Sequence, residues 1–359
     1  MKSNTIFKRK KNNQPYLISG PCSAETPEQL HTIAQGLKKN VELDVLRAGI
    51  WKPRTRPNSF EGNGEKALKW LLDTKKDLNL KTTVEVANAS HVELALKYEV
   101  DILWIGARTT VNPFSVQEIA DALKGVDVPV MIKNPINPDL QLWIGGLERI
   151  QQAGITNVAV IHRGFSAYGI SNYRNKPMWE IPIELKRLYN DLPIICDPSH
   201  IGGKRSLIES IAQKAMDLTF DGLMIESHND PDNAWSDAKQ QITPKVLKSI
   251  LNRLVLRNAT FSDNALLLQL QELRSNIDSL DEDIIHRISK RMDLIEIIGN
   301  LKKENNIPIL QVERWSSILE HLNKLGAENN LSEKFMTEFL NAIHTESIRK
   351  QTLIMNNEN

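Results

Sequence analysis

Eight short runs of apolar, largely β-branched residues recur along the first two thirds of the chain, and longer amphipathic stretches separate them. The runs are Tyr16–Gly20, Asp44–Ala48, Thr82–Val86, Ile102–Gly106, Pro129–Lys133, Asn157–His162, Pro193–Cys196 and Gly222–Glu226. Strands that alternate with helices pair in parallel through right-handed crossovers. Eight such units in about 240 residues predict a closed (β/α)8 barrel. A doubly wound open sheet is the alternative, but no glycine-rich dinucleotide-binding turn follows the first run.

The alternation of strand and helix patterns ends near Asn258. The chain is therefore expected to form two domains, 1–257 and 265–359, joined by a polar linker at 258–264. After the linker, apolar residues recur at spacings of three and four, which predicts one long helix from about Ala265 to Lys303. Two shorter helices, about Gln311–Leu325 and Leu331–Met355, follow on either side of Gly326. Because two short helices cannot cover so long an apolar stripe, we expect this all-α domain to form a homodimer.

Composition excludes several classes of function. The formal net charge is +1, which gives no reason to expect a nucleic-acid partner. No apolar run approaches the ~20 residues that a membrane span needs. The basic N-terminus has no apolar stretch after it, so we expect no secretory signal. Two cysteines are too few for a disulfide framework, and a reducing cytoplasm is the expected location.

Cationic side chains follow the predicted strands of the barrel. They are Arg47, Lys52, Arg54, Arg108, Lys133 and Arg163. The carboxyl ends of barrel strands meet on one face, where barrel enzymes hold their substrates. Any one of these residues could be a solvated surface charge. Six together would repel one another unless an anion neutralised them, and lysine and arginine suit phosphate and carboxylate groups.

Four possible metal ligands also follow the strands: Cys22, His200, Glu226 and Asp237. A mixed sulfur, nitrogen and oxygen set is poor for a closed structural site and suits an open divalent site that would accept manganese, iron, cobalt or zinc. The alternatives are a buried thiol, a loop histidine and two ion-paired carboxylates.

The order of these motifs resembles type I 3-deoxy-D-arabino-heptulosonate 7-phosphate (DAHP) synthase over roughly 15–256. The matching segments are Gly20–Ser23, Arg47 with Lys52–Thr55, Gly106–Thr109, Ile132–Lys133, His162–Gly164, Asp197–His200, Glu226 and Ser236–Gln241. The resemblance implies a metal-dependent condensation of phosphoenolpyruvate with erythrose 4-phosphate. The sequence Lys-Pro-Arg-Thr at 52–55 distinguishes the chain from the sister family that makes the eight-carbon octulosonate phosphate.

The resemblance also implies roles for individual residues. Cys22, His200, Glu226 and Asp237 would bind the metal. Arg108, Lys133 and Arg163 would hold phosphoenolpyruvate, with Arg47 and Lys52 close to it, and Arg54 and Thr55 would bind the phosphate of erythrose 4-phosphate. Lys52 is a candidate proton donor to the developing alkoxide. Glu85 could position water or form a structural ion pair.

The helical domain carries a second group of cations, Arg274, Arg291 and Lys302. Arg291 and Lys302 lie within ~20° of one helix face and about 16 Å apart, whereas Arg274 is rotated by ~100° and could be supplied by a two-fold partner. Each could also be an ordinary exposed charge.

The spacing from about Leu270 to Thr352 resembles the all-helical chorismate mutases, which convert chorismate to prephenate. That resemblance implies that Arg274 of a partner subunit, Arg291, Arg314 and Ser347 contact carboxylates, and that Lys302 and Gln351 contact the ether oxygen. Trp315 and Gln311 stand where this family commonly has acidic residues.

Together these patterns predict two enzymes on one chain, with prephenate inhibiting the barrel through the helical domain. In an alternative hypothesis the helical domain serves only dimerisation and regulation. In another, the barrel uses a different phosphorylated aldehyde.

Overall fold

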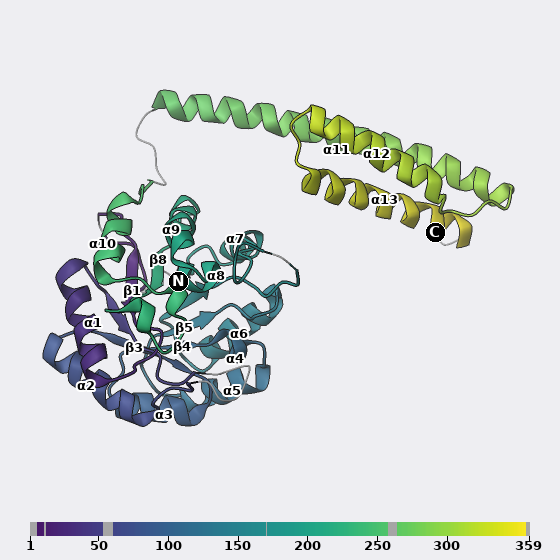
Figure 1. Ribbon diagram of the computed structural model, residues 1–359. Coiled ribbons are helices and arrows are strands. Elements are labelled where there is room, and N and C mark those ends of the chain that lie inside the picture. Colours follow the sequence, from purple (N-terminus) through teal and green to yellow (C-terminus); the bar gives the residue numbers. More distant parts are fainter. Residues whose placement is uncertain (1–5, 11, 53–59, 170, 258–263, 357–359) are drawn as a thin grey trace. The chain divides into compact units, whose positions relative to one another are not determined.

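The computed structural model describes residues 6–10, 12–52, 60–169, 171–257 and 264–356. The chain forms two compact units, Met1–Ala259 and Thr260–Asn359. Figure 1 shows a unit of alternating strands and helices and a unit made of helices. Each unit is described by itself.

The strands of the first unit close into a parallel barrel in chain order. Their bounds are β1 Tyr16–Gly20, β2 Val45–Arg47, β3 Thr82–Val86, β4 Ile102–Ile105, β5 Val130–Lys133, β6 Val158–His162, β7 Ile194–Cys196 and β8 Gly222–Glu226. The closing pair joins β1 to β8, from Tyr16 opposite Gly222 to Gly20 opposite Glu226. This pairing confirms the (β/α)8 barrel and excludes the open sheet. Every strand end lies within one residue of the position expected from the sequence.

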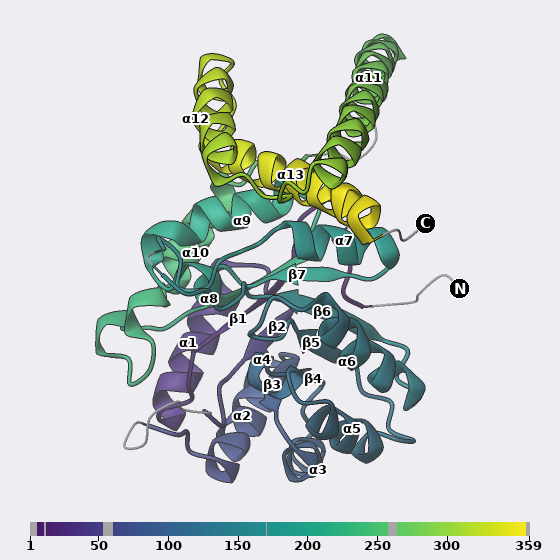
Figure 2. The ribbon, with the colours of Figure 1, turned by 90° about the vertical axis from the view of Figure 1, so that its right-hand side faces the viewer.

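Helices surround the barrel (Figures 1 and 2). Their bounds are α1 Pro27–Asn40, α2 Glu65–Leu78, α3 Ala89–Lys97, α4 Ala107–Thr110, α5 Pro113–Ala122, α6 Leu140–Gln152, α7 Glu180–Leu188, α8 Pro198–Gly202, α9 Ile208–Asp217 and α10 Pro244–Arg253. Side-chain caps begin several of them. Thr26 accepts a hydrogen bond from Gln29 N, and Asp139 accepts one from Leu142 N. Such caps satisfy the free amides of the first helical turn, so the short polar loops also fix where each helix begins.

The barrel has two apolar layers. The larger lies between the strands and the surrounding helices, and the smaller fills the barrel interior. Phe7 packs edge-on against Tyr16 in the interior layer, with ring centroids 5.6 Å apart. Because Tyr16 opens β1, this contact lies at the N-terminal end of the strands. The opposite end, where the strands finish, carries the polar residues described below.

The second unit consists of α11 Asn264–Glu304, α12 Val312–Glu328 and α13 Glu333–Asn356. Its architecture and the great length of its first helix agree with the sequence prediction. Gly326, however, was expected between the last two helices and instead lies inside α12. A Cβ at Gly326 would lie 2.5 Å from Met336 Cγ, so glycine lets α12 approach α13 closely. Within the described parts of the chain, none of the helices is both long and apolar enough to cross a bilayer.

Candidate active sites

The ends of the barrel strands bring most of the expected site residues to one face. Arg47, Lys133 and Glu226 are the last residues of β2, β5 and β8. Cys22 follows β1 by two residues, and His200 lies in the short helix α8 directly after β7. Each position follows from the parallel arrangement, because successive strands end on the same side of the barrel. Arg54 and Thr55 lie outside the described residues.

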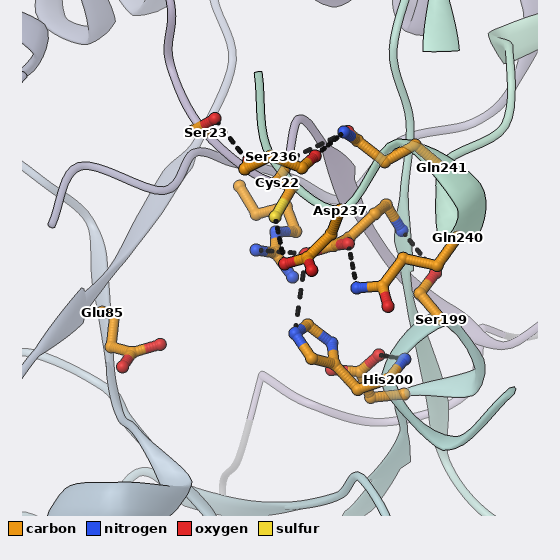
Figure 3. A network of polar contacts seen from close by, with 12 residues as sticks. Cys22, Ser23, Glu85, Ser199, His200, Ser236, Asp237, Gln240 and Gln241 are labelled. Atoms are coloured by element: carbon orange, nitrogen blue, oxygen red, sulfur yellow. Dashed lines mark hydrogen bonds and ion pairs between the residues drawn. The ribbon is translucent and has the colours of Figure 1, made fainter. Parts of the chain in front are cut away.

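The four expected metal ligands lie beside one another in pairs (Figure 3). Cys22 Sγ is 3.2 Å from Asp237 Oδ2, and His200 Nε2 is 3.7 Å from Glu226 Oε1. Within the described residues, no three histidine, cysteine, aspartate or glutamate side chains are grouped as a ready cation site. Cationic side chains contact the expected ligands instead.

Three cations make these contacts. Lys52 Nζ is 2.8 Å from Cys22 Sγ, Arg47 Nη2 is 3.1 Å from Glu226 Oε1, and Arg174 Nη1 is 2.9 Å from Asp237 Oδ1. The ligand residues are therefore held close together by neighbouring positive charge.

The chemistry of the four side chains fits a divalent transition metal. His200 Nδ1 lies 2.7 Å from Asp197 Oδ2, although this nitrogen makes no hydrogen bond among the described residues, and Nε2 would be the nitrogen that holds a metal. Glu226 is fully buried, and its Oε1 accepts no hydrogen bond from the described residues. Arg47 already supplies one positive charge to this oxygen, and because the oxygen accepts no hydrogen bond it keeps the free acceptor capacity that a metal ligand needs.

Burial and neighbouring charges shift the pKa values of the side chains at this site. Burial, with help from Glu226, raises the pKa of the Cys22 thiol to about 12, although Lys52 opposes the shift. Burial lowers the pKa of His200, so its ring is neutral at pH 7. Burial alone would raise the pKa of Asp237, but Arg174 and Lys52 lower it below its usual range. A protonated thiol thus meets an ionised carboxylate, and metal binding would release the thiol proton.

Buried cations occupy the rest of this face. Lys133 Nζ pairs with Asp197 Oδ2 at 2.9 Å, and both side chains are buried. Arg163 Nη1 donates to Asn175 Oδ1 at 2.9 Å. Burial, together with the charges of Arg174 and Arg108, lowers the pKa of Arg163 to about 10, although Asp197 opposes the shift. The guanidinium groups of Arg163 and Arg174, both between β6 and α7, and of Arg108 in α4 are therefore close enough to repel one another, as a site for an anion requires.

A glutamine clamp joins the loop after β1 to the loop after β8. Gln241 Oε1 accepts a hydrogen bond from Cys22 N at 2.9 Å, and its Nε2 donates to Ser236 O at 2.8 Å (Figure 3). Ser23 Oγ lies 2.6 Å from Ser236 Oγ. These bonds fix the loop that presents Asp237, whose φ of 45° lies in the left-handed region.

Two further residues at this face had no role assigned from the sequence. Arg174 bonds Asp237 and Gln240, and Gln240 Nε2 donates to Glu226 Oε2 at 2.7 Å. Gln240 lies within Ser236–Gln241, one of the segments on which the family resemblance rests. Arg174 belongs to a loop whose sequence has no pattern that could have indicated its role.

In the helical unit, Arg291 of α11 and Ser347 of α13 are in contact, with Nη1 2.6 Å from Oγ. Gln351 is buried one turn further along α13, and its Oε1 has no hydrogen-bond partner among the described residues. Lys302 Nζ donates to Ile309 O at 2.6 Å. Arg291, Ser347 and Gln351 lie along the contact between α11 and α13, and Lys302 lies near the C-terminal end of α11.

Two further expected residues, Arg274 and Arg314, are exposed. Arg274 lies apart from the group, about 26 Å from Arg291 along α11, since a helix rises 1.5 Å per residue. One chain therefore does not bring Arg274 to the others. Trp315 stacks on His344 with ring centroids 3.8 Å apart, so the position that is commonly acidic carries an aromatic pair here.

Two protein families match the chain. The DAHP synthetase I family matches residues 3–258, and chorismate mutase type II matches residues 273–352. A phospho-2-dehydro-3-deoxyheptonate aldolase of Thermotoga maritima is 30% identical over 238 residues, which cover 66% of this chain and 68% of that protein. A 2-dehydro-3-deoxyphosphooctonate aldolase of Desulfotalea psychrophila is also 30% identical, over 68% of this chain and 90% of its own length.

The helical part and the fold have their own relatives. A bifunctional chorismate mutase/prephenate dehydratase of Buchnera aphidicola is 36% identical over 87 residues, which cover 24% of this chain and 23% of that protein. The crystal structure of the Thermotoga maritima DAHP synthase superposes with a TM-score of 0.59 at 28% identity and covers 67% of this chain and 68% of that one. A truncated form of the Thermotoga maritima synthase gives 0.58 at 25% identity, over 75% and 88% of the two chains. The chain therefore belongs to the DAHP synthetase I family and joins to that barrel a chorismate mutase type II domain, as a bifunctional enzyme of the shikimate pathway.

Proposed function

We propose that the barrel condenses phosphoenolpyruvate with erythrose 4-phosphate at a divalent metal held by Cys22, His200, Glu226 and Asp237. The observation that carries this proposal is the adjacency of that mixed ligand set to the buried cations Arg47 and Lys133. When bound, the cation would supply Lewis acidity toward the aldehyde oxygen. A single face thus offers both the charge for two anionic substrates and the ligands for one metal.

Lys52 is the proposed proton donor to the alkoxide that forms from the aldehyde. Burial would lower its pKa, but Cys22 and Glu226 outweigh burial and raise it. The side chain therefore keeps its proton at pH 7 and can give it to a stronger base. Arg108, Lys133 and Arg163 are the proposed phosphoenolpyruvate residues, with Arg47 beside them. Holding both substrates on this face removes much of the entropic barrier to their reaction.

Phosphoenolpyruvate consumption by the purified full-length protein tests the barrel proposal. Activity with erythrose 4-phosphate is expected to fall with a chelator and to return with Mn²⁺. The mutase reaction on the same chain is the internal control, because a pericyclic rearrangement needs no metal. Barrel activity that survives effective metal removal would contradict the four-ligand proposal. Preference for a five-carbon over a four-carbon sugar phosphate would instead favour the alternative aldehyde.

For the helical unit we propose conversion of chorismate to prephenate. Arg291 contacts Ser347, Gln351 lies one turn along α13, and Lys302 lies about 16 Å from Arg291 along α11, near the same helix face. Cations beside the carboxylates and a donor at the ether oxygen suffice, because negative charge grows there in the transition state. Loss of chorismate absorbance in the presence of the protein is the direct assay. Its absence in folded protein would leave the helical unit as a dimerisation or regulatory module.

We also propose that a second copy of the chain covers α11 and completes the mutase site with its Arg274. Four apolar residues of α11 that lie within about 60° of one helix face are about half exposed or more. They are Leu273, Ile277, Leu280 and Ile284. A stripe of this kind in an aqueous protein calls for an apolar partner. Prephenate, the product of this site, is the proposed inhibitor of the barrel.

A further inference from the structure

One tryptophan of the barrel interior contacts the charged groups of the active face. Trp104 belongs to β4, is 1% exposed and packs in the interior apolar layer. Its strand ends at Ile105, so the indole lies just beneath the level where the substrate-binding side chains begin. The ring can interact electrostatically as well as pack, because charged side chains lie on one side of it.

Two cations lie over the indole. Arg47 Cζ is 5.1 Å from the ring centroid and Lys133 Nζ is 5.8 Å from it. Both cations are almost fully buried. Arg47 Nη2 is paired with Glu226, but Nε and Nη1 have no hydrogen-bond partner among the described residues, so this side of the guanidinium depends on other contacts. The negative face of an indole attracts such cations, and tryptophan does so most strongly of the aromatic side chains.

The indole edge holds a carboxylate. Trp104 Nε1 donates a hydrogen bond to Glu85 Oε2 at 3.0 Å. A Cβ at Gly106 would lie 2.1 Å from Glu85 Oε1, so glycine at 106 leaves the space that this carboxylate fills. Figure 3 places Glu85 across the site from Cys22, Asp237 and His200. One side chain thus orients two cations by its face and an anion by its edge.

We propose that Trp104 is a positioning residue of the barrel reaction. Its face fixes Arg47 and Lys133 for the anionic groups of phosphoenolpyruvate, and its N–H fixes Glu85 beside the reacting atoms. The inference rests on the proposed barrel function. Because face and edge serve different steps, substitutions that remove one or the other have different kinetic consequences.

Two variants separate the roles, and a third is the control. Trp104→Phe keeps an aromatic face and removes the N–H donor. Trp104→Gln keeps an N–H donor and removes the face. Trp143→Phe is the matched control, since Trp143 is also fully buried and its Nε1 also donates one hydrogen bond, to Ile132 O at 3.1 Å, but it contacts none of the site charges in the described part of the chain.

The measurements are phosphoenolpyruvate binding by calorimetry, and kcat and KM, on full-length protein with Mn²⁺. Trp104→Gln is expected to weaken binding about tenfold, because both cations lose their support. Trp104→Phe is expected to leave binding within about threefold and to lower kcat about tenfold, because Glu85 loses the hydrogen bond that orients it. Trp143→Phe is expected to change neither by more than about twofold while lowering thermal stability.

Trp104 variants that behave like Trp143→Phe would overturn the inference, as would equal losses of binding and turnover in both of them. If Trp104→Gln fails to fold, Trp104→Phe alone decides, because its expected effect is on kcat and not on binding. A wild-type protein that binds phosphoenolpyruvate, with unaffected Trp104 variants, leaves the proposed function standing. A wild-type protein that binds none contradicts the proposed function and the inference together.

Discussion

At the scale of single residues, the barrel site is a set of charges that stabilise one another before any substrate binds. Arg47 pairs with Glu226, Lys133 with Asp197, and each of these four side chains is buried. Removing one member of such a pair leaves the other buried without compensation, which costs roughly 3–5 kcal/mol. Stability and catalysis therefore depend on the same residues here. Substitutions of residues next to these ion pairs can test function without removing a buried charge.

The glutamine clamp offers one such test. Gln241→Leu removes the acceptor for Cys22 N and the donor to Ser236 O without changing a proposed ligand. We expect Mn²⁺ affinity to fall about tenfold, the lower end of the effect of residues that orient metal ligands, with activity recovering at high Mn²⁺. Calorimetric titration of metal-free protein measures the affinity. Gln35→Leu, on the exposed face of α1, is the control, and equal affinities in the two variants would refute the role of the clamp.

A buried histidine makes a second prediction at this scale. His162 lies among Trp143, Phe165, Trp179 and Phe220. Burial, with Arg163 nearby, lowers its pKa to about 3. The unfolded chain then binds one more proton than the folded chain between pH 3 and 6.5, so stability from this residue is lost as pH falls through that window. The loss at pH 5 is roughly 2 kcal/mol.

His162→Gln has no titrating ring and should lack that part of the pH dependence. Urea unfolding of both proteins at pH 7.5 and pH 5, followed by tryptophan fluorescence, gives the comparison. The other titrating groups are common to both proteins and cancel in the difference. An identical decline in the two proteins would show that His162 is not the group responsible.

At the scale of elements, α11 is the part of the chain whose surface does not suit a solitary helix. Its buried residues are Met292 and Gly299, both in its second half. The first half exposes the apolar stripe from Leu273 to Ile284. Packing against α13 thus accounts for one half of the helix, and the other half has no apolar cover within the described residues.

Ile277→Glu places a charge in the centre of that stripe. We expect it to convert a dimer into monomers and to abolish mutase activity, because burial of an unpaired carboxylate is costly and the partner's Arg274 is lost with the interface. Sedimentation equilibrium and chorismate turnover measure the two effects. Gln271→Glu adds the same charge to an exposed position on the opposite side of α11 and should do neither. A wild-type monomer with full mutase activity would contradict the dimer.

At the scale of the whole molecule, two sites on one chain can be coupled through binding free energy. Coupling must be reciprocal, so prephenate that weakens phosphoenolpyruvate binding must itself bind less tightly in the presence of phosphoenolpyruvate. Arg291→Met should lower mutase kcat/KM by at least about a hundredfold, since a charged contact in the transition state is lost. It should leave uninhibited barrel activity unchanged and remove inhibition by prephenate. A flat response of wild-type barrel activity to prephenate would exclude the feedback.

The sequence by itself determined the architecture of both units. Strand periodicity and strand count define the barrel, because parallel strands joined by helices have few ways to close. The same rule places Arg47, Lys133 and Glu226 on one face, because each ends a strand. The apolar stripe of α11 was equally readable, since period and length are local properties. Gly326 was misassigned to a helix end, because a glycine needed for close helix packing and one that ends a helix look alike in sequence.

Only the tertiary structure decided which residues meet across distant loops. Gln241 reaches Cys22 N over a separation of 219 residues, and Arg174 reaches Asp237 from a loop without a motif. In the sequence, Trp104 is one more apolar residue of a predicted strand. In the structure, its ring lies beneath Arg47 and Lys133, and its Nε1 donates a hydrogen bond to Glu85. Periodicity reports which side of a strand a residue occupies. It carries no information about the side chain that another strand places opposite, and the fine electrostatics of the site depend on those pairings.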